Sequence, residues 1–187
     1  MKYKVTFLDY WHLGSGLSAG SKLDSTIIKD ENGLPYVPGK TIKGLIREMA
    51  ELSDNKDFIF KCFGSSSSTD DKFYSKDKIM GECYFSNIEI EENTKEFIRK
   101  NSLQNELFDE IVSTKIDKKT GTAESGSLRE IEVVVPISLI GEINNIPKEY
   151  KDEMANSLKK IKRMGLNRNR GLGRCFIEIL GEDKWEQ

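Results

Sequence analysis

The segment MGLNRNRGLGRC, residues 164–175, alternates glycine with arginine between a predicted basic helix and a predicted apolar strand. Glycine permits positive backbone φ angles and close approach to a ligand, and the segment has three: Gly165, Gly171 and Gly173. Guanidinium groups bind phosphate through paired donors, and they are supplied by Arg168, Arg170 and Arg174. With Asn169 between the arginines, the pattern predicts an anion-binding loop. The alternative is a helix C-cap and an ordinary turn with solvated arginines.

The basic character is local to this part of the chain. Residues 154–177 contain seven Lys or Arg and no Asp or Glu, whereas the formal net charge of all 187 residues is −2. Hydrophobic residues make up 37%, which is enough for a core, and the length predicts one domain, 1–187. No secretory signal or membrane-length apolar run is present, so we expect a cytoplasmic protein without membrane association.

The three cysteines, Cys62, Cys83 and Cys175, are far apart and odd in number. This favours buried, reduced thiols over a disulfide framework. A zinc site of three cysteines and His12 is conceivable, but no two of these ligands have the close spacing typical of such sites. We expect no organic cofactor.

In the first half of the chain, β-branched and aromatic residues predict a strand over 2–10. Asn32-Gly33 predicts a hairpin between 25–29 and 34–37. Apolar spacing predicts a helix over 40–49, whose other side carries Lys40, Lys43 and Arg47. Neither Gly14-Ser15-Gly16 nor Gly39-Lys40-Thr41 has the context of a nucleotide-binding motif. A helix N-terminus near lysines is nevertheless a candidate phosphate site.

In the second half, we expect a strand over 79–91, a mixed and partly helical segment over 97–112, and an exposed insertion over 113–123. A Val- and Ile-rich strand over 128–140 contains Pro136, which predicts a bulge or an edge. A helix over 148–164 and a strand over 175–180 complete the order. Without insertions this is βαββαβ, an α+β fold of ferredoxin-like (RRM-like) type.

Several segments resemble, in order, the RAMP superfamily of CRISPR-associated proteins: 12–16, 34–47, 62–65, 115–123 and the glycine-rich C-terminal loop. The chain looks most like the backbone subunit of type III effector complexes. The resemblance implies a palm with an inserted β-hairpin thumb near 113–130. It also implies guide RNA (crRNA), target RNA and other effector subunits as partners. Because one palm covers few nucleotides, we expect a homo-oligomeric filament along RNA. The short finger region departs from the family pattern.

The same resemblance implies cleavage of target RNA through Asp24, which would also bind a divalent metal, Mg or Mn. A carboxylate can hold such an ion or accept the proton of the attacking 2′-hydroxyl. The alternative is a turn cap at Asp24. His12 is a weak candidate for RNA contact and otherwise a structural histidine. Tyr10, Trp11 and Tyr36 are candidates for base stacking or for the core.

Three other functions remain open. The first is a non-catalytic subunit that caps the same complex. The second is a repeat-processing ribonuclease of the superfamily, which would cut guide precursors without metal. The third is a ferredoxin-like domain that senses a small molecule and does not bind RNA.

Overall fold

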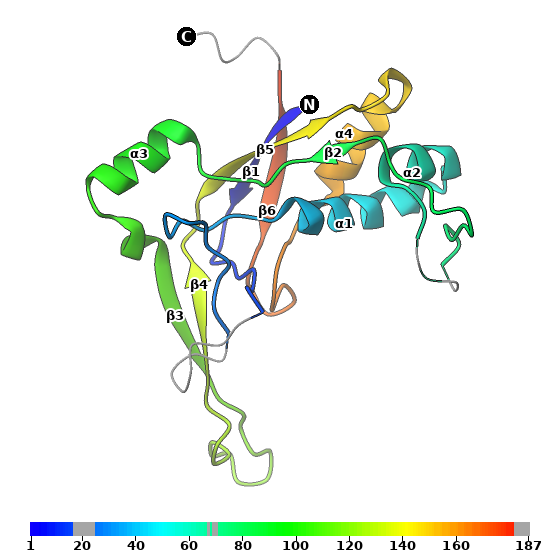
Figure 1. Ribbon diagram of the computed structural model, residues 1–187. Coiled ribbons are helices and arrows are strands. Elements are labelled where there is room, and N and C mark those ends of the chain that lie inside the picture. The colour runs from blue at the N-terminus through cyan, green and yellow to red at the C-terminus, as the bar shows by residue number, and fades with distance from the viewer. Residues whose placement is uncertain (17–24, 67, 69–70, 182–187) are drawn as a thin grey trace.

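The computed structural model describes residues 1–16, 25–66, 68 and 71–181, and its centre is a four-stranded antiparallel sheet (Figure 1). Its strands are β1 (Lys2–Phe7), β2 (Tyr84–Phe85), β5 (Ser138–Asn144) and β6 (Cys175–Leu180), in the order β2-β5-β1-β6. Lys2 of β1 is opposite Glu142 on one side and Leu180 on the other. The N-terminal strand is therefore held between two strands from the end of the chain.

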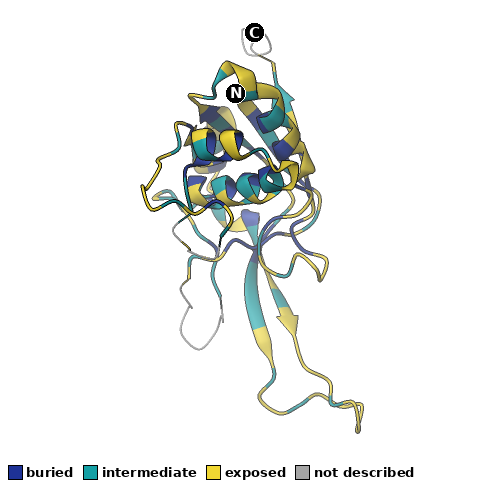
Figure 2. Cartoon of the chain, turned by 90° about the vertical axis from the view of Figure 1, so that its right-hand side faces the viewer, coloured by how far each residue is buried: buried dark blue, intermediate teal, exposed yellow. Residues whose placement is uncertain are grey.

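Two helices, α1 (Gly39–Ala50) and α4 (Lys151–Lys160), pack against each other beside this sheet. α4 contacts β6, and α1 contacts β2. Alternation along β1 buries Tyr3, Val5 and Phe7, while α1 buries Ile42 and Ile46 on its apolar face. Figure 2 shows the buried residues gathered in this body of the molecule. The core therefore lies between the sheet and the helical layer.

A shorter helix, α2 (Lys56–Phe63), follows α1 after a 3-10 turn at Glu51–Ser53. It begins where the Asn55 side chain accepts a hydrogen bond from the Phe58 amide. A second 3-10 turn, Lys148–Tyr150, leads into α4. The rings of Tyr150 and Phe58 lie 5.4 Å apart between centroids, which joins α2 to the start of α4.

A separate hairpin projects from the body of the molecule (Figure 1). α3 (Glu92–Lys100) and the 3-10 turn Gln104–Leu107 lead into β3 (Phe108–Ser113), which pairs with β4 (Arg129–Val134) as a two-stranded sheet. Residues 114–128 form the tip, which Figure 2 shows as mostly exposed. The segment 113–130, implied as an insertion by the family resemblance, occupies this tip.

The prediction of one strand over 128–140 is wrong. The structure divides the segment at Pro136 into β4 and β5, which belong to different sheets. Proline has no amide hydrogen for a ladder and restricts the residue before it, so the chain leaves one sheet here and enters the other. The first strand, the helix over 40–49 and the strand over 175–180 are confirmed, with β1 ending at Phe7.

Three predicted elements are shorter than expected. The strand over 79–91 is reduced to β2, and the helix over 148–164 ends at Lys160. The predicted hairpin at 25–37 keeps its turn, because the Asp30 side chain accepts from the Asn32 and Leu34 amides at 2.8 Å. Its arms share one isolated bridge, between Lys29 and Pro35. Among the described residues, no helix is long and apolar enough to cross a membrane.

Candidate nucleic-acid interface

The glycine-rich loop, residues 164–175, is held to the segment after β1 by backbone hydrogen bonds. The Gly173 amide donates to the Tyr10 carbonyl at 2.8 Å, and the Leu166 amide donates to the His12 carbonyl at 2.8 Å. Within the loop, the Met164 amide donates to the Gly173 carbonyl at 2.9 Å. These bonds and the buried side chains of Met164 and Leu172 hold the loop against the body of the protein.

The glycines of this loop have two different roles. Gly165, Gly171 and Gly173 all have positive φ, as predicted. A side chain on Gly165 would collide with the His12 carbonyl, and one on Gly173 with the Met164 carbonyl. These two positions therefore need glycine for packing within the chain, which corrects the expectation that they approach a ligand. Only Gly171, of the three, faces open space.

The arginines of the loop also differ in availability. Arg168, Asn169 and Arg170 are exposed, and within the described part of the chain their side chains have no hydrogen-bond or ion-pair partner. The Arg168 carbonyl accepts from Arg163 Nη1 at 2.6 Å, which supports the turn. Arg174 instead pairs with Asp9 at 3.1 Å. The fixed backbone thus presents two free guanidinium groups, while the third is partly neutralised.

The start of α1 is not an open anion site as predicted. The Gly39 amide already donates to Asn87 Oδ1 at 2.9 Å, and the Thr41 and Ile42 amides point to the Pro38 carbonyl. Gly39 is also packed so closely against the Phe85 carbonyl that a side chain would collide there. The exposed Lys40 is the group that remains available at this end of the helix.

The other two basic residues predicted on α1 are engaged within the protein. Arg47 Nε pairs with Glu51 at 2.9 Å, and Nη1 donates to the Gly64 carbonyl at 3.3 Å. The Arg47 side chain is 18% exposed and its guanidinium lies 5.9 Å from the Phe73 ring centroid. Lys43 Nζ lies 5.9 Å from the ring centroid of Phe85. Arg47 is thus a structural residue that joins α1 to the segment after α2.

His12 is buried, with 1% of its surface exposed, and both ring nitrogens have partners. Nδ1 lies 2.6 Å from the Glu132 carbonyl and so carries the proton, and Nε2 lies 3.0 Å from Ser25 Oγ and accepts from it in the neutral ring. The predicted RNA contact is therefore corrected to a structural role, which the sequence analysis named as the alternative. His12 links β4 to Ser25, and the predicted catalytic residue Asp24 lies outside the described residues.

Glu132 is the central polar residue at the base of the hairpin, and it was not among the residues predicted from the sequence. Its carboxylate accepts from the Ile27 amide at 2.9 Å and pairs with Lys29 at 2.6 Å. Lys29 lies 3.8 Å from the Phe108 ring centroid. The position of Glu132 in the sequence could have indicated this role, because it is the one charged residue inside the apolar run 131–135 and a buried charge requires partners. The network holds the hairpin base to the segment after Asp24.

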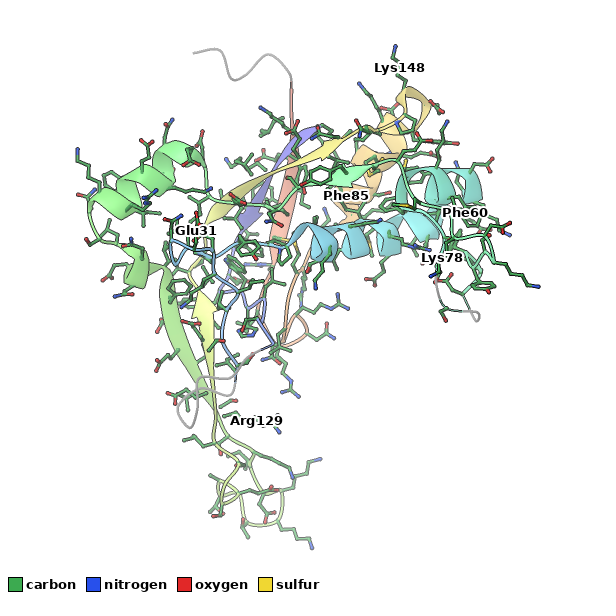
Figure 3. All side chains as sticks on the ribbon, viewed as in Figure 1. Glu31, Phe60, Lys78, Phe85, Arg129 and Lys148 are labelled. Carbon is green, nitrogen blue, oxygen red and sulfur yellow. The ribbon has the colours of Figure 1, made fainter. Side chains whose placement is uncertain are left out.

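The tip of the hairpin and the strand residues next to it combine cationic and apolar side chains on an exposed surface (Figure 3, where Arg129 marks the start of β4). Lys115 pairs with Glu124 at 2.9 Å, whereas Lys118 and Lys119 are exposed. Three large apolar side chains are also half or more exposed: Val112, Ile116 and Leu128. Such a surface suits contact with a charged polymer that carries apolar bases.

The described residues contain no group of three or more His, Cys, Asp or Glu side chains that could hold a metal ion. The zinc site that includes His12 is absent from that part of the chain, and its three cysteines are buried free thiols.

A sequence model of the RAMP superfamily matches residues 4–176. The chain belongs to the RAMP superfamily. A comparison with curated proteins found no match. Among solved structures, this RAMP chain is similar to a chain of a Type III-B Cmr-beta complex bound to cognate target RNA, with 13% identity, a TM-score of 0.69 and 95% of each chain covered. It is also similar to a chain of the Type III-B Cmr-beta complex in the apo state, with 13% identity, a TM-score of 0.68 and 97% of each chain covered.

In this RAMP protein, most of the segments that suggested the family form the scaffold of the site. Gly39 packs on the backbone of β2, and a side chain on Gly64 would lie 2.5 Å from the Ile79 carbonyl. His12 joins β4 to Ser25. The side chains that the structure leaves available belong to the glycine-rich loop and the hairpin tip.

Proposed function

We propose that this RAMP chain is a guide-RNA-binding backbone subunit of a type III CRISPR effector complex and cleaves paired target RNA through Asp24. The observation that carries the proposal is a pair of guanidinium groups, on Arg168 and Arg170, that have no partner among the described residues and belong to a loop bonded through its backbone to the segment after β1. Because the backbone that carries them is already held in place, only side-chain entropy is lost when they bind phosphate.

The fold supports this role. The elements β1, α1, β2, β5, α4 and β6 follow one another as in a ferredoxin-like palm, and the β3–β4 hairpin is inserted between β2 and β5. We assign that hairpin as the thumb, which enters between guide and target. Its mixed cationic and apolar tip fits this assignment, and the Glu132 network keeps its base fixed.

Binding through the loop should be electrostatic and independent of sequence. Arg168→Ala combined with Arg170→Ala should weaken binding to any single-stranded RNA at least tenfold and lower the slope of log K against log salt by about two. Filter binding at several salt concentrations measures both. The matched control is Lys148→Ala with Lys151→Ala, which removes equal charge; Lys148 lies at the end of the molecule away from the hairpin tip (Figure 3). An equal loss in both variants would reject the loop as the binding site.

Cleavage uses the 2′-hydroxyl of RNA as nucleophile, so the protein has to align it with the phosphorus and stabilise the added charge. Asp24 would bind Mg or Mn, which supplies that charge stabilisation when present. The bonds of His12 to Glu132 and Ser25 define the position of the residue next to Asp24. Products should end in a 2′,3′-cyclic phosphate.

The test uses the assembled complex. Asp24→Asn should abolish cleavage of target RNA and leave guide binding unchanged, and a 2′-deoxy nucleotide at the cut site should protect the target. Asp77→Asn, at an exposed carboxylate, is the control and should cut normally. Full cleavage by Asp24→Asn would reject Asp24. No cleavage by the unmutated complex with Mg or Mn would favour a non-catalytic capping subunit.

One observation and one experiment separate the remaining functions. A repeat-processing enzyme with a histidine acid or base is disfavoured because the only histidine of the chain is buried and bonded at both nitrogens. The backbone role requires assembly, so particle size measured by light scattering should grow with RNA length. A single copy of the chain bound to long RNA would indicate the capping role. Absence of any RNA binding would indicate ligand sensing.

A further inference from the structure

Two of the three cysteines, distant in sequence, lie side by side in the core. Cys62 is in the last turn of α2 and Cys83 directly precedes β2. The Cys83 amide donates to the Cys62 carbonyl at 3.3 Å, and the Glu82 amide donates to the Lys61 carbonyl at 2.8 Å. The two backbones therefore run next to each other over both residues, so the two cysteines are neighbours in the fold, as a disulfide requires.

The two thiols are chemically unequal. The interaction between the two thiols raises the pKa of Cys62 and lowers the pKa of Cys83, while burial and the charge of Glu82 oppose the lowering at Cys83. Cys83 Sγ also donates to the Asn145 carbonyl at 3.7 Å. Cys83 is 8% exposed, whereas Cys62 is fully buried. Cys83 thus has the properties of an attacking thiolate and Cys62 those of a resolving thiol. The lone Cys175 differs, because burial raises its pKa to about 12.

We propose that Cys62 and Cys83 form a redox-sensitive dithiol that peroxides oxidise reversibly to an intrachain disulfide. The Cys83 thiolate attacks one peroxide oxygen, the O–O bond breaks and hydroxide leaves, which gives a sulfenic acid. The Cys62 thiol then attacks that sulfur, the S–S bond forms and water leaves. The pair loses two electrons and two protons, and hydrogen peroxide is reduced to two water molecules.

The disulfide would close the loop between α2 and β2. This loop lies against α1 through the bond of Arg47 to the Gly64 carbonyl, and it contains the bridge between Gly64 and Met80. Closing a loop of this length restricts the unfolded chain, so oxidation should stabilise the fold. Neither cysteine is among the residues proposed to bind RNA or to cleave it.

The test treats the reduced full chain with hydrogen peroxide, alkylates it under denaturing conditions and maps its peptides by mass spectrometry. We expect a Cys62–Cys83 crosslink that dithiothreitol reverses, a fully alkylated Cys175, and a melting temperature several degrees higher for the oxidised chain. Cys175→Ser is the matched control and should form the same crosslink. Cys62→Ser should instead accumulate a sulfenic acid at Cys83 that dimedone traps.

Oxidation of Cys175 as fast as the pair, or oxidation of Cys83 without a crosslink to Cys62, would overturn the proposal. The peptide map of the unmutated chain decides this even if a serine variant does not fold.

Discussion

Helix α1 and the glycine-rich loop each carry three basic residues that the sequence predicts to bind RNA, yet they use them differently. On α1, Arg47 is taken up by Glu51 and the Gly64 carbonyl, whereas Lys40 is exposed. In the loop, Arg168 and Arg170 have no side-chain partner among the described residues, because backbone bonds, the Arg163 side chain and the buried Met164 and Leu172 hold the loop in place. A basic side chain is therefore available for a ligand only where other contacts hold its segment in place.

The largest expected effect tests the backbone framework of the loop. Gly173→Ala should destabilise the fold by about 3 kcal/mol or more, because the new Cβ would collide with the Met164 carbonyl. Thermal and urea unfolding measure the loss. Gly171→Ala is the matched control: its φ is also positive, at 92°, but it faces open space, so its cost should be about 1 kcal/mol. Equal costs would show that only backbone strain matters.

The next effect tests whether Arg47 is structural. Arg47→Ala should cost about 2 kcal/mol of stability, because it leaves the Gly64 carbonyl and Glu51 without their partner. The salt dependence of RNA binding should be unchanged. Urea unfolding and salt titration of RNA binding separate the two readouts. A variant of normal stability with a lower salt slope would mean that Arg47 binds phosphate after all.

A smaller effect is expected at the exposed end of the same helix. Lys40→Ala should leave stability within about 0.5 kcal/mol of the unmutated chain, since no ion pair is lost within the described residues. It should lower the salt slope of RNA binding by about one, corresponding to one phosphate contact. If the slope is unchanged, RNA binding is confined to the loop and the hairpin, and α1 only supports them.

The smallest expected effect on RNA binding concerns the pair of Arg174 and Asp9. Arg174→Ala should change stability by less than about 1 kcal/mol, as is usual for surface ion pairs. Substitution of the acidic partner of this pair is more informative. Asp9→Asn should release the guanidinium and strengthen RNA binding slightly, which low-salt filter binding can detect. Weaker binding by Asp9→Asn would indicate that the pair orients Arg174 for RNA.

Local sequence patterns predicted the parts of the fold that depend on local interactions. The 3.6-residue spacing of α1 and the alternation of β1 and β6 determine those elements, and the glycines at 165, 171 and 173 gave the positive φ angles. Pro136 was recognised as an interruption, but the sheet that receives each half of that segment depends on partners far along the chain. The same holds for β2, because its length is set by its pairing with β5, which is distant along the chain.

The candidate site was less predictable, for a related reason. Glu51, four residues after Arg47, could have indicated that this arginine is paired, but the Gly64 carbonyl could not be foreseen. The partners of the buried His12 are Ser25, 13 residues away along the chain, and Glu132, 120 residues away. No local sequence motif contains both of them. Asp24 remains a prediction, as it lies outside the described residues.

The central position of β1 has a consequence for biosynthesis. β1 is translated long before both of its sheet neighbours, β5 and β6, which come from residues 138–180. The sheet therefore cannot assemble until most of the chain has been translated. Its apolar residues Tyr3, Val5 and Phe7 need protection in the meantime, because an unpaired apolar strand favours aggregation. This arrangement predicts slow folding of high contact order and a dependence on chaperones during translation.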